Sequence, residues 1–250
     1  MSSMTISLIV FAVIFGGALL GMTLRALLPE HHLSPDSRDV VKLGMGLIGT
    51  ISALVLGLLV ASAKSSFDAQ RNGLAQLSAN LVLLDRIFAH YGKESESCRT
   101  QLRELVTNLL AQLWPEDRTE GAKVEPTAAS ESLYERIQEL TPRNESQRVL
   151  QAAAIKTGMD IAQARWLLSA QKSSALQAPF LIVLVFWLAV LFASFSMFAK
   201  PNATVFLALL LCALSVAAAL FLILELDRPF DGMIQLSSDP LRRALAQLGR

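Results

Sequence analysis

Charged residues are scarce in this sequence, and their scarcity excludes several classes of protein. Of the 250 residues, 17% are Asp, Glu, Lys or Arg and 53% are hydrophobic, whereas soluble domains carry about 25% charged residues. With a mean hydropathy of +0.46, the chain is neither an ordinary soluble domain nor a disordered protein. The net charge is only +1, so no overall field favours nucleic acid, and we expect no nucleic-acid partner. The composition indicates a membrane protein.

Cysteine pairs and the sequence motifs of enzymes are absent as well. The two cysteines are Cys98 and Cys212; Cys212 lies inside an apolar stretch, so we expect no disulfide between them, which fits a reducing compartment for Cys98. The sequence has no G-x-S-x-G, P-loop, H-E-x-x-H or C-x-x-C motif. No Asp, Glu, His, Lys or Arg lies deep in an apolar stretch, as a proton relay or an intramembrane catalytic pair would require. We therefore expect neither an enzyme nor a bound cofactor.

Four long apolar stretches organise the chain. They cover residues 6–28, 43–63, 180–199 and 203–226, and each is long enough for a helix across a hydrocarbon core of roughly 30 Å. The segment between the second and third is mostly polar and too long for a loop without secondary structure. We predict an all-α fold with transmembrane helices 1 and 2 in residues 1–63, a cytoplasmic helical region in 64–178, transmembrane helices 3 and 4 in 179–226, and a cytoplasmic C-terminal tail in 227–250.

The predicted orientation depends on the basic residues near the membrane ends. Four spans place both termini and the middle region on one side. That side carries seven nearby Lys or Arg residues against four on the other, so the positive-inside rule puts both termini in the cytoplasm. The uncharged residues before Arg25 favour the opposite orientation for the first span alone.

One continuous helix is predicted from the second apolar stretch into the middle region. No charge lies between Lys42 and Lys64, an interval of about 22 residues, or roughly 33 Å of helix. Beyond it, apolar residues recur at spacings of seven, three and four, the a/d pattern of a packed helical seam. They are Phe67, Leu74, Leu77, Leu81, Leu84, Phe88 and Tyr91. Gly92 is the first stop signal, so the helix is expected to leave the membrane and keep packing in water.

A face of small residues runs along the membrane part of this helix. At about 100° per residue, one side carries Lys42, Gly46, Gly49, Ala53, Gly57 and Lys64, with Thr50 beside them. We call these seven residues the small-residue face. Such a face favours tight helix packing, with a lysine reaching each membrane surface. It also suits an axial pathway in an oligomer, where lysines at both mouths favour anions, Thr50 offers a hydroxyl and an apolar middle gates by dewetting. The sequence leaves both interpretations open.

A polar row follows the small-residue face beyond the membrane. It consists of Asp68, Asn72, Gln76 and Asn80, four residues apart on the helix. The row either continues an ion pathway on the cytoplasmic side or is a solvated surface with local pairs such as Lys64–Asp68. The solvated surface is the preferred interpretation.

An acidic group follows the fourth apolar stretch. Glu225, Asp227 and Asp231 supply carboxylates of the kind that Ca²⁺ binds. Arg228 lies among them, and three carboxylates are few for this ion, so the expected arrangement is a turn held by ion pairs. A calcium site at Asp227 and Asp231 is the less favoured alternative.

Further helices are expected outside the membrane. Apolar spacing predicts helices over residues 98–114 and 128–140. Thr141-Pro142, a cap residue followed by proline, is expected to start a long helix that continues through Leu168. Pro179 marks a kink or a new start at the membrane. Ser237 or Ser238, with Asp239-Pro240, is expected to start a short amphipathic helix over residues 241–248.

Two segments resemble a known family. DAQRNGLAQLSANLVLLDRIFAHYG (residues 68–92) and LDRPFDGMIQLSSDPLR (residues 226–242) are similar to bacterial membrane proteins described as bestrophin-like, a family of unknown function. The order of two spans, cytoplasmic helices and two spans matches too, so the resemblance covers nearly the whole chain. It implies a multi-pass protein of the bacterial inner membrane.

A more distant similarity to bestrophins themselves involves helix order rather than motifs. Bestrophins are pentameric, mostly anion-selective channels whose second spans line the pore and carry an aromatic-rich neck. The similarity implies a homo-pentamer among membrane lipids that passes inorganic ions. The second span here has no Phe, so Ile48, Ile51 and Leu54 would form the apolar gate. The acidic run that binds calcium in animal bestrophins is reduced to Asp227 and Asp231, which argues against calcium gating.

The leading expectation is therefore an oligomeric, anion-favouring ion channel with the second transmembrane helix around the pore. The alternative is a non-conducting membrane scaffold or signalling protein whose cytoplasmic helices bind a partner.

Overall fold

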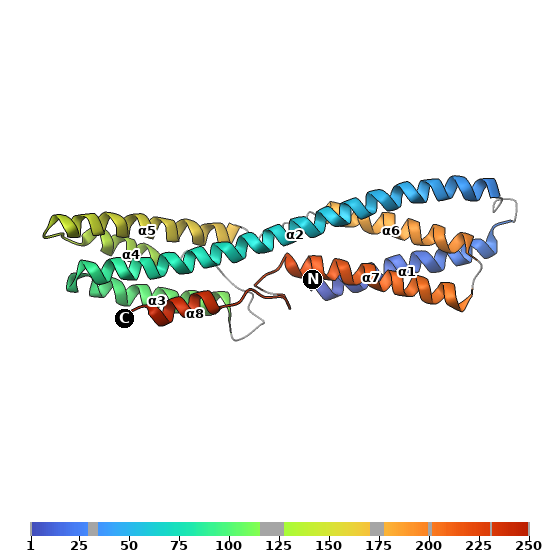
Figure 1. The fold of residues 1–250 in the computed structure, drawn as a ribbon. Helices are drawn as coiled ribbons and strands as arrows, with labels where there is room; N and C mark the ends of the chain where they lie inside the picture. The colour runs from blue at the N-terminus through green and yellow to red at the C-terminus, as the bar shows by residue number, and fades with distance from the viewer. Residues whose placement is uncertain are drawn as a thin grey trace. The chain divides into compact units, whose positions relative to one another are not determined.

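The computed structural model describes residues 2–29, 35–115, 128–170, 178–199, 202–230 and 232–249. Figure 1 shows their helices in chain order. These are α1 (Ser3–Leu27), α2 (Pro35–Tyr91), the short 3-10 helix η2 (Lys93–Ser95), α3 (Glu96–Leu113), α4 (Ala128–Glu139), α5 (Glu145–Ala170), α6 (Ala178–Phe198), α7 (Ala203–Leu226) and α8 (Asp239–Gln247). The described residues contain no strand, so the predicted all-α fold is confirmed.

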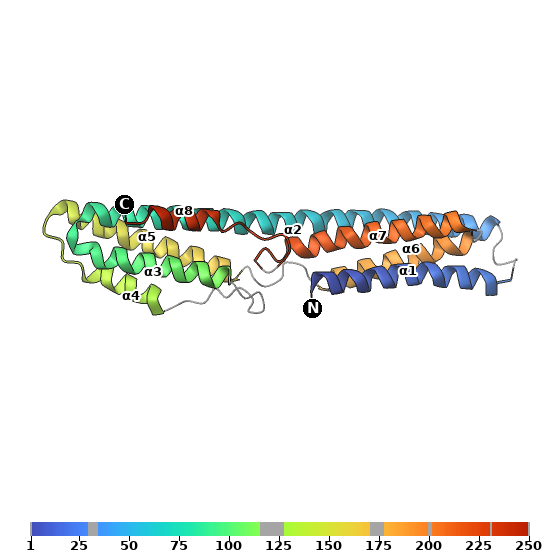
Figure 2. The same ribbon diagram turned by 90° about the horizontal axis from the view of Figure 1, so that it is seen from below.

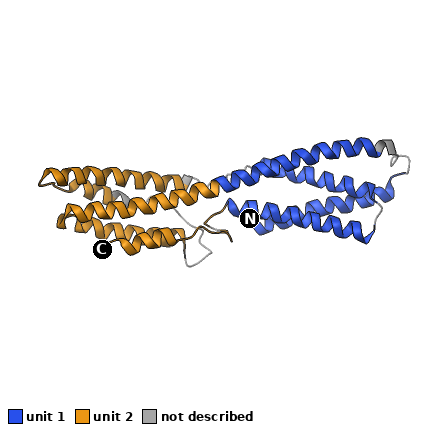
Figure 3. Cartoon of the chain, in the orientation of Figure 1, with its two compact units in different colours: residues 1–65, 174–227 blue, residues 66–173, 228–250 orange. Residues whose placement is uncertain are grey.

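The chain divides into two compact units (Figure 3). Unit 1 comprises residues 1–65 and 174–227, and unit 2 comprises residues 66–173 and 228–250. Four of the described helices, α1, α2, α6 and α7, are long and apolar enough to cross a membrane. Three of them and the first part of α2 belong to unit 1, which contains the four apolar stretches of the sequence.

Unit 1 is held together by a close contact of α1 with α6. Gly17 and Gly21 lie on the buried side of α1, and a Cβ added at Gly17 would lie 2.7 Å from the Ala189 carbonyl oxygen. At Gly21 the added atom would overlap the Ala193 carbonyl oxygen and the Ser196 hydroxyl. Only glycine permits the two backbones to come this close. In lipid there is no hydrophobic driving force between helices, so such close packing is what holds them together. In both ribbon views α1, α6 and α7 run beside the first part of α2 (Figures 1 and 2).

The helix α2 is continuous over 57 residues, which confirms the prediction that it runs on past the second apolar stretch. Its predicted seam is confirmed as well, because Leu77, Leu81, Leu84 and Phe88 are all 0% exposed in the core of unit 2. The helix stops where expected. Gly92 has φ +116°, a left-handed backbone region that favours glycine.

Unit 2 packs α3, α4, α5 and α8 around the second part of α2. The apolar sides of these helices form one core, to which α3 contributes Leu102, Val106, Leu109 and Leu113 and α8 contributes Leu241. The helices predicted at 98–114 and 128–140 are α3 and α4, with bounds shifted by one or two residues. The last predicted helix is α8, with Ser238 as its N-cap residue and a proline in its first turn.

The predicted start of the long helix at Thr141-Pro142 is wrong, because α5 begins at Glu145. Asn144 caps the helix instead: its side-chain oxygen accepts a hydrogen bond from the Gln147 backbone N–H at 2.8 Å. The Gln147 side chain in turn accepts one from the Arg143 N–H at 2.8 Å. Together these two bonds satisfy the backbone donors of Gln147 and Arg143 at the start of α5. At the membrane end, α6 begins at Ala178, next to Pro179; the connection before it lies outside the described residues.

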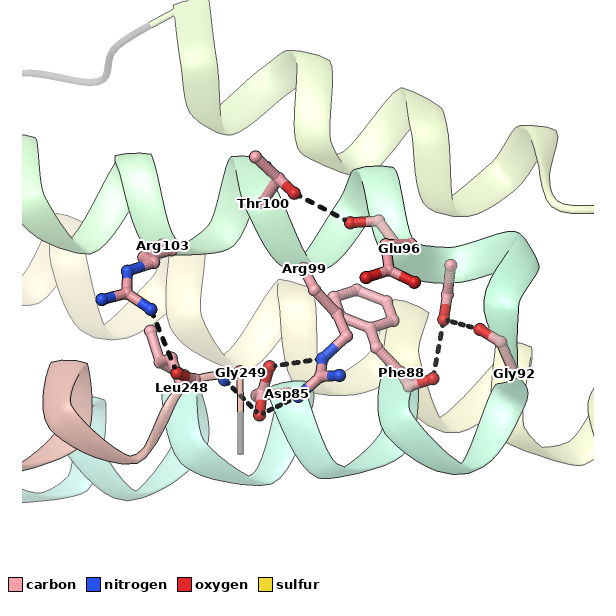
Figure 4. Close-up of polar contacts among 10 residues, drawn as sticks. Asp85, Phe88, Gly92, Glu96, Arg99, Thr100, Arg103, Leu248 and Gly249 are labelled. Atoms are coloured by element: carbon pink, nitrogen blue, oxygen red, sulfur yellow. Dashed lines mark hydrogen bonds and ion pairs between the residues drawn. The ribbon is translucent and has the colours of Figure 1, made fainter.

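A buried ion pair fixes the C-terminal tail to unit 2 (Figure 4). Arg99 on α3 binds both carboxylate oxygens of Asp85 on α2, at 2.9 and 3.1 Å, and the Asp85 side chain is 2% exposed. Asp85 also accepts a hydrogen bond from the Gly249 N–H at 3.3 Å, and Arg103 donates to the Leu248 carbonyl oxygen at 3.5 Å. The hydrogen bonds that Arg99 donates to Asp85 raise the pKa of Arg99 above its ordinary value. One buried carboxylate thereby joins α2, α3 and the tail.

Candidate functional site

The small-residue face of α2 is open within the protomer. Lys42, Gly46, Thr50, Ala53, Gly57 and Lys64 are exposed, and Gly49 is half-buried. A Cβ added at Gly46, Gly49 or Gly57 would meet no atom within 4 Å. Gly17 and Gly21 of α1 lie against α6, whereas these three glycines of α2 contact nothing in the described residues of their own chain. The face is therefore available to lipid, to water or to another copy.

A neighbouring side of α2, roughly a third of a turn around the helix from the small-residue face, attaches this helix to unit 1. Met45, Ser52, Leu59 and Ala63 are buried, with Ala63 at 0% exposure. They recur at spacings of seven and four, the spacing of one helix side. This side packs into the same core as α1, α6 and α7. The small-residue face thus lies beside the packed side of the helix, with the half-buried Gly49 at the border between them.

Basic residues lie at one end of the small-residue face. Lys42 lies 3.4 Å from Asp39, with 59% of its side chain exposed. One turn earlier, Arg38 donates to the Phe198 carbonyl oxygen at 2.7 Å, and its guanidinium lies 5.8 Å from the Phe198 ring centroid. Arg25 donates to the neighbouring Met197 carbonyl oxygen at 3.2 Å.

From the sequence, Arg25 and Arg38 contribute only to the predicted membrane orientation. The structure shows that Arg25 and Arg38 cap the C-terminus of α6, where unpaired carbonyls carry partial negative charge. The sequence signal for this role is the position of Arg25 in the last turn of α1 and of Arg38 in the first turn of α2. Lys42 is left as the exposed cation at this end of the small-residue face.

The Thr50 hydroxyl is already engaged by the helix. It donates to the Gly46 carbonyl oxygen at 2.8 Å. In this rotamer the oxygen lone pairs, rather than the hydrogen, remain for an outside partner. An anion on this face would have to draw the hydroxyl away from Gly46, whereas a cation would not.

The three residues expected to form an apolar gate do not share one side of α2. Ile48 packs against the core of unit 1, while Ile51 is 37% and Leu54 is 74% exposed. Residues two apart on a helix are roughly 200° apart, so Ile51 points almost opposite to Ala53. Leu54 lies one turn from both Thr50 and Gly57, at the border of the small-residue face. Of the three, Leu54 has the geometry to restrict a passage along that face.

The polar row beyond the membrane lies on the surface of α2. Asn72 and Gln76 are exposed, and Asp68 and Asn80 are half-buried. Gln76 donates to the Asn80 side-chain oxygen at 3.0 Å. A hydrogen bond one turn apart is the local pairing expected of a solvated helix surface.

The acidic group after the fourth span is only partly described. Glu225 is 4% exposed at the end of α7, and the Asp227 N–H donates to the Ile223 carbonyl oxygen at 3.2 Å as the helix ends. Asp231 lies outside the described residues. Within the described residues, no three His, Cys, Asp or Glu side chains come close enough to hold a metal ion. The calcium alternative at Asp227 and Asp231 stays a prediction.

The fold and these sites define a class: a four-span, all-α membrane protein whose second span continues as a long helix into an extramembrane bundle. The model of the Bestrophin-like domain matches residues 12–241, and the chain belongs to this family. None of the curated proteins matches the sequence.

Solved structures agree with the family assignment at the level of the fold. Two crystal structures of a bacterial bestrophin homolog from Klebsiella pneumoniae, each with a different point mutation, are similar to this chain. The first has 15% sequence identity and a TM-score of 0.71, covering 97% of this chain and 99% of the homolog. The second has 13% identity and a TM-score of 0.65, covering 95% and 99%. The predicted bestrophin-like topology is therefore confirmed along nearly the whole chain.

Proposed function

We propose that the protein is an oligomeric ion channel of the bacterial inner membrane, with the small-residue faces of several copies of α2 around a common axis. Family membership and fold support a channel. The main observation in support of the proposal is the open space beside Gly46, Gly49 and Gly57. A helix interior gains nothing from glycine, and the protomer does not use these glycines for packing.

The proposed pathway favours anions. Lys42 and Lys64 are exposed at the two ends of the face, and cations at both mouths attract anions and repel cations. Between them the face carries no ionisable group, so conduction depends on the width of the passage and on its wetting. Leu54 is the proposed constriction. The excess of basic residues on the side of unit 2 supports a cytoplasmic position for that unit and both termini.

The competing proposal is a membrane scaffold in which the same faces close on one another. Small residues at helical spacing bring backbones together without any passage. The two proposals differ in whether a large side chain on the face is tolerated by the oligomer.

Ala53→Trp separates the two proposals. The full-length protein would be purified, its oligomeric state measured, and chloride and potassium fluxes followed from liposomes. In a channel, the indole blocks flux while the oligomer persists. In a closed scaffold, it breaks the assembly.

Leu58→Trp is the matched control. Leu58 is 67% exposed on the same helix but lies on a different side from Ala53, so this variant should conduct like the wild type. Replacing Lys42 and Lys64 by Gln should lower chloride flux more than potassium flux. Silence of the wild type under all ionic conditions, with an intact oligomer, would support the scaffold.

A further inference from the structure

Two arginines from different helices converge at one end of unit 1. Arg25 lies in the last turn of α1 and Arg38 in the first turn of α2. Their guanidinium groups donate to adjacent carbonyl oxygens at the end of α6, that of Met197 at 3.2 Å and that of Phe198 at 2.7 Å. Both ribbon views show the end of α1, the start of α2 and the end of α6 together at this end of unit 1 (Figures 1 and 2). The fold therefore holds two positive charges close together.

The described residues supply little negative charge to this pair of arginines. Neither guanidinium forms an ion pair with a carboxylate of the described residues, and the Asp39 carboxylate lies 3.4 Å from Lys42 instead. A helix C-terminus carries only about half a negative charge, and one carbonyl accepts only one of the five N–H groups of a guanidinium. The Arg38 Nε atom is buried without a hydrogen-bond partner in the part of the chain that the structure describes. Two like charges with free donors favour an anion between them.

This end of unit 1 corresponds to a membrane surface, because two candidate spans end there, at Leu27 and Phe198. Both arginines are half-buried, so part of each side chain is accessible. Leu24 and Leu27, in the same turn as Arg25, are 42% and 80% exposed and offer an apolar surface to acyl chains. A phospholipid carries its phosphate at this depth and its chains beside such leucines, and basic residues between spans are typical of head-group sites.

We propose that Arg25 and Arg38 bind the phosphate of an anionic phospholipid in the corner formed by α1, α2 and α6. A guanidinium matches a phosphate with two parallel hydrogen bonds. Because the site carries two positive charges, it favours a lipid with net negative charge over a zwitterionic lipid, whose head group brings a cation of its own. The site is independent of ion conduction and its test needs no flux, so either proposal can fail without the other.

Native mass spectrometry of the delipidated full-length protein tests the proposal. The protein would be titrated in detergent with dioleoylphosphatidylglycerol and with dioleoylphosphatidylcholine, which has the same chains and a phosphate but no net charge. We expect one saturable phosphatidylglycerol site per chain, with a Kd at least about tenfold lower than that for phosphatidylcholine. Glycerol phosphate, which lacks the chains, should not compete at equal concentration. Equal affinity for the two lipids, or full competition by glycerol phosphate, would overturn the proposal.

Three variants assign the binding to this corner of unit 1. Arg25→Gln and Arg38→Gln should each weaken phosphatidylglycerol binding about tenfold, because each removes one charge and its hydrogen bonds to the phosphate. Arg148→Gln is the matched control: it removes an exposed arginine of unit 2 and should leave the preference for the anionic lipid unchanged. An unchanged preference in both Arg25→Gln and Arg38→Gln would show that these arginines only cap α6, and would contradict the proposal.

A photoreactive phosphatidylglycerol locates the site in the wild type, so the test does not depend on the folding of a variant that lacks a helix cap. With the reactive group near the glycerol, crosslinks should concentrate in the last turn of α1, at Leu24 and Leu27, and in the first turn of α2. Crosslinks confined to the other end of the spans, near Lys64, would place the lipid elsewhere and refute the assignment.

Discussion

The two parts of α2 are built by different rules. In unit 2 the helix buries a leucine seam in the core of its own protomer, with Leu77, Leu81 and Leu84 fully buried. In unit 1 the same helix leaves its glycines without a contact, and leucines such as Leu54 and Leu58 are largely exposed. In water, burial of leucine stabilises the protomer. In lipid, exposed leucine costs nothing, and close contact of small residues has to hold helices together.

The glycines of α1 show what such contact looks like when it is made. Gly17 and Gly21 bring α1 against the α6 backbone, whereas Gly46, Gly49 and Gly57 bring α2 against nothing in the described protomer. The comparison indicates that α2 contributes an incomplete surface in unit 1 and a complete one in unit 2. Its extramembrane part stabilises the protomer, and its membrane part is the surface on which the proposed assembly or pathway would act.

The strongest test of this difference replaces one glycine of each kind by alanine. Gly21→Ala would place its Cβ into the Ala193 carbonyl oxygen, so α1 and α6 would have to separate. We expect a loss of about 3 kcal/mol or more in the free energy of unfolding in mixed micelles. Gly57→Ala meets open space and should change it by less than about 1 kcal/mol. Equal destabilisation would show that the protomer also packs on the small-residue face.

A second test concerns the buried ion pair in unit 2. Asp85→Ala leaves the Arg99 guanidinium without its carboxylate and releases the Gly249 N–H, which should cost about 3–5 kcal/mol in the free energy of unfolding. Glu94→Ala breaks the exposed 3.1 Å pair with Arg143 and should cost less than about 1 kcal/mol. The readouts are chemical unfolding and protease cleavage of the C-terminal tail. An Asp85→Ala protein as stable as the control would contradict the role assigned to this pair.

A third test compares leucines from the two parts of α2. Leu81→Ala creates a cavity in the core of unit 2, because Leu81 is 0% exposed, and should cost about 2–5 kcal/mol. Leu54 is 74% exposed, so Leu54→Ala should change the free energy of unfolding by less than about 0.5 kcal/mol. If Leu54 restricts the passage, the same variant should increase ion flux. A large loss of stability in Leu54→Ala would place this leucine in a subunit contact.

The smallest effect on stability is expected from ionisation of the Cys98 thiol as the pH is raised. This thiol is 1% exposed in the core of unit 2, and burial raises its pKa above the ordinary value of 9.0. The stability linked to the neutral thiol is present below about pH 9 and is lost as the pH rises from there. Labelling by a water-soluble maleimide should therefore be slow at neutral pH and faster above pH 9.

A second cysteine extends this test to the membrane part of α2. The variant Ala53→Cys, made in a Cys212→Ala background, places a thiol on the small-residue face. Labelling needs an accessible thiolate. If the face is in contact with water, this thiol should therefore react at least about tenfold faster than Cys98. Equal rates would mean that the face is dry and closed.

Long apolar stretches and a/d spacing were enough to predict the helices. The seam from Leu74 to Phe88 was correct because periodic burial on one helix is a local property of the sequence. Gly92 was recognised as the stop for the same kind of reason. The predicted start of α5 is wrong because two caps compete within a few residues. The later one is stabilised by the hydrogen bonds from the Gln147 N–H to Asn144 and from the Arg143 N–H to the Gln147 side chain.

The candidate sites were predictable only in part. Spacing grouped the small-residue face, but it could not show that Ile48 packs into the core of unit 1, since an isoleucine in a span fits lipid or protein equally well. Nor could it show that Arg25 and Arg38 cap α6, or that Arg165 lines a cavity. These roles depend on residues far away in the chain.

The sequence by itself determined the class of protein, the four spans, the continuity of α2 and the leucine seam, because each follows from hydrophobicity and spacing within one helix. Tertiary structure decided which glycines lie against a neighbouring helix and which have free space beside them. It also decided which arginines bind the carbonyls of a helix end, and where a cavity remains. Those outcomes follow from the distance between helices, which side chains from several parts of the chain set together. That is why Gly21 and Gly57, both glycines within apolar helices, have opposite surroundings.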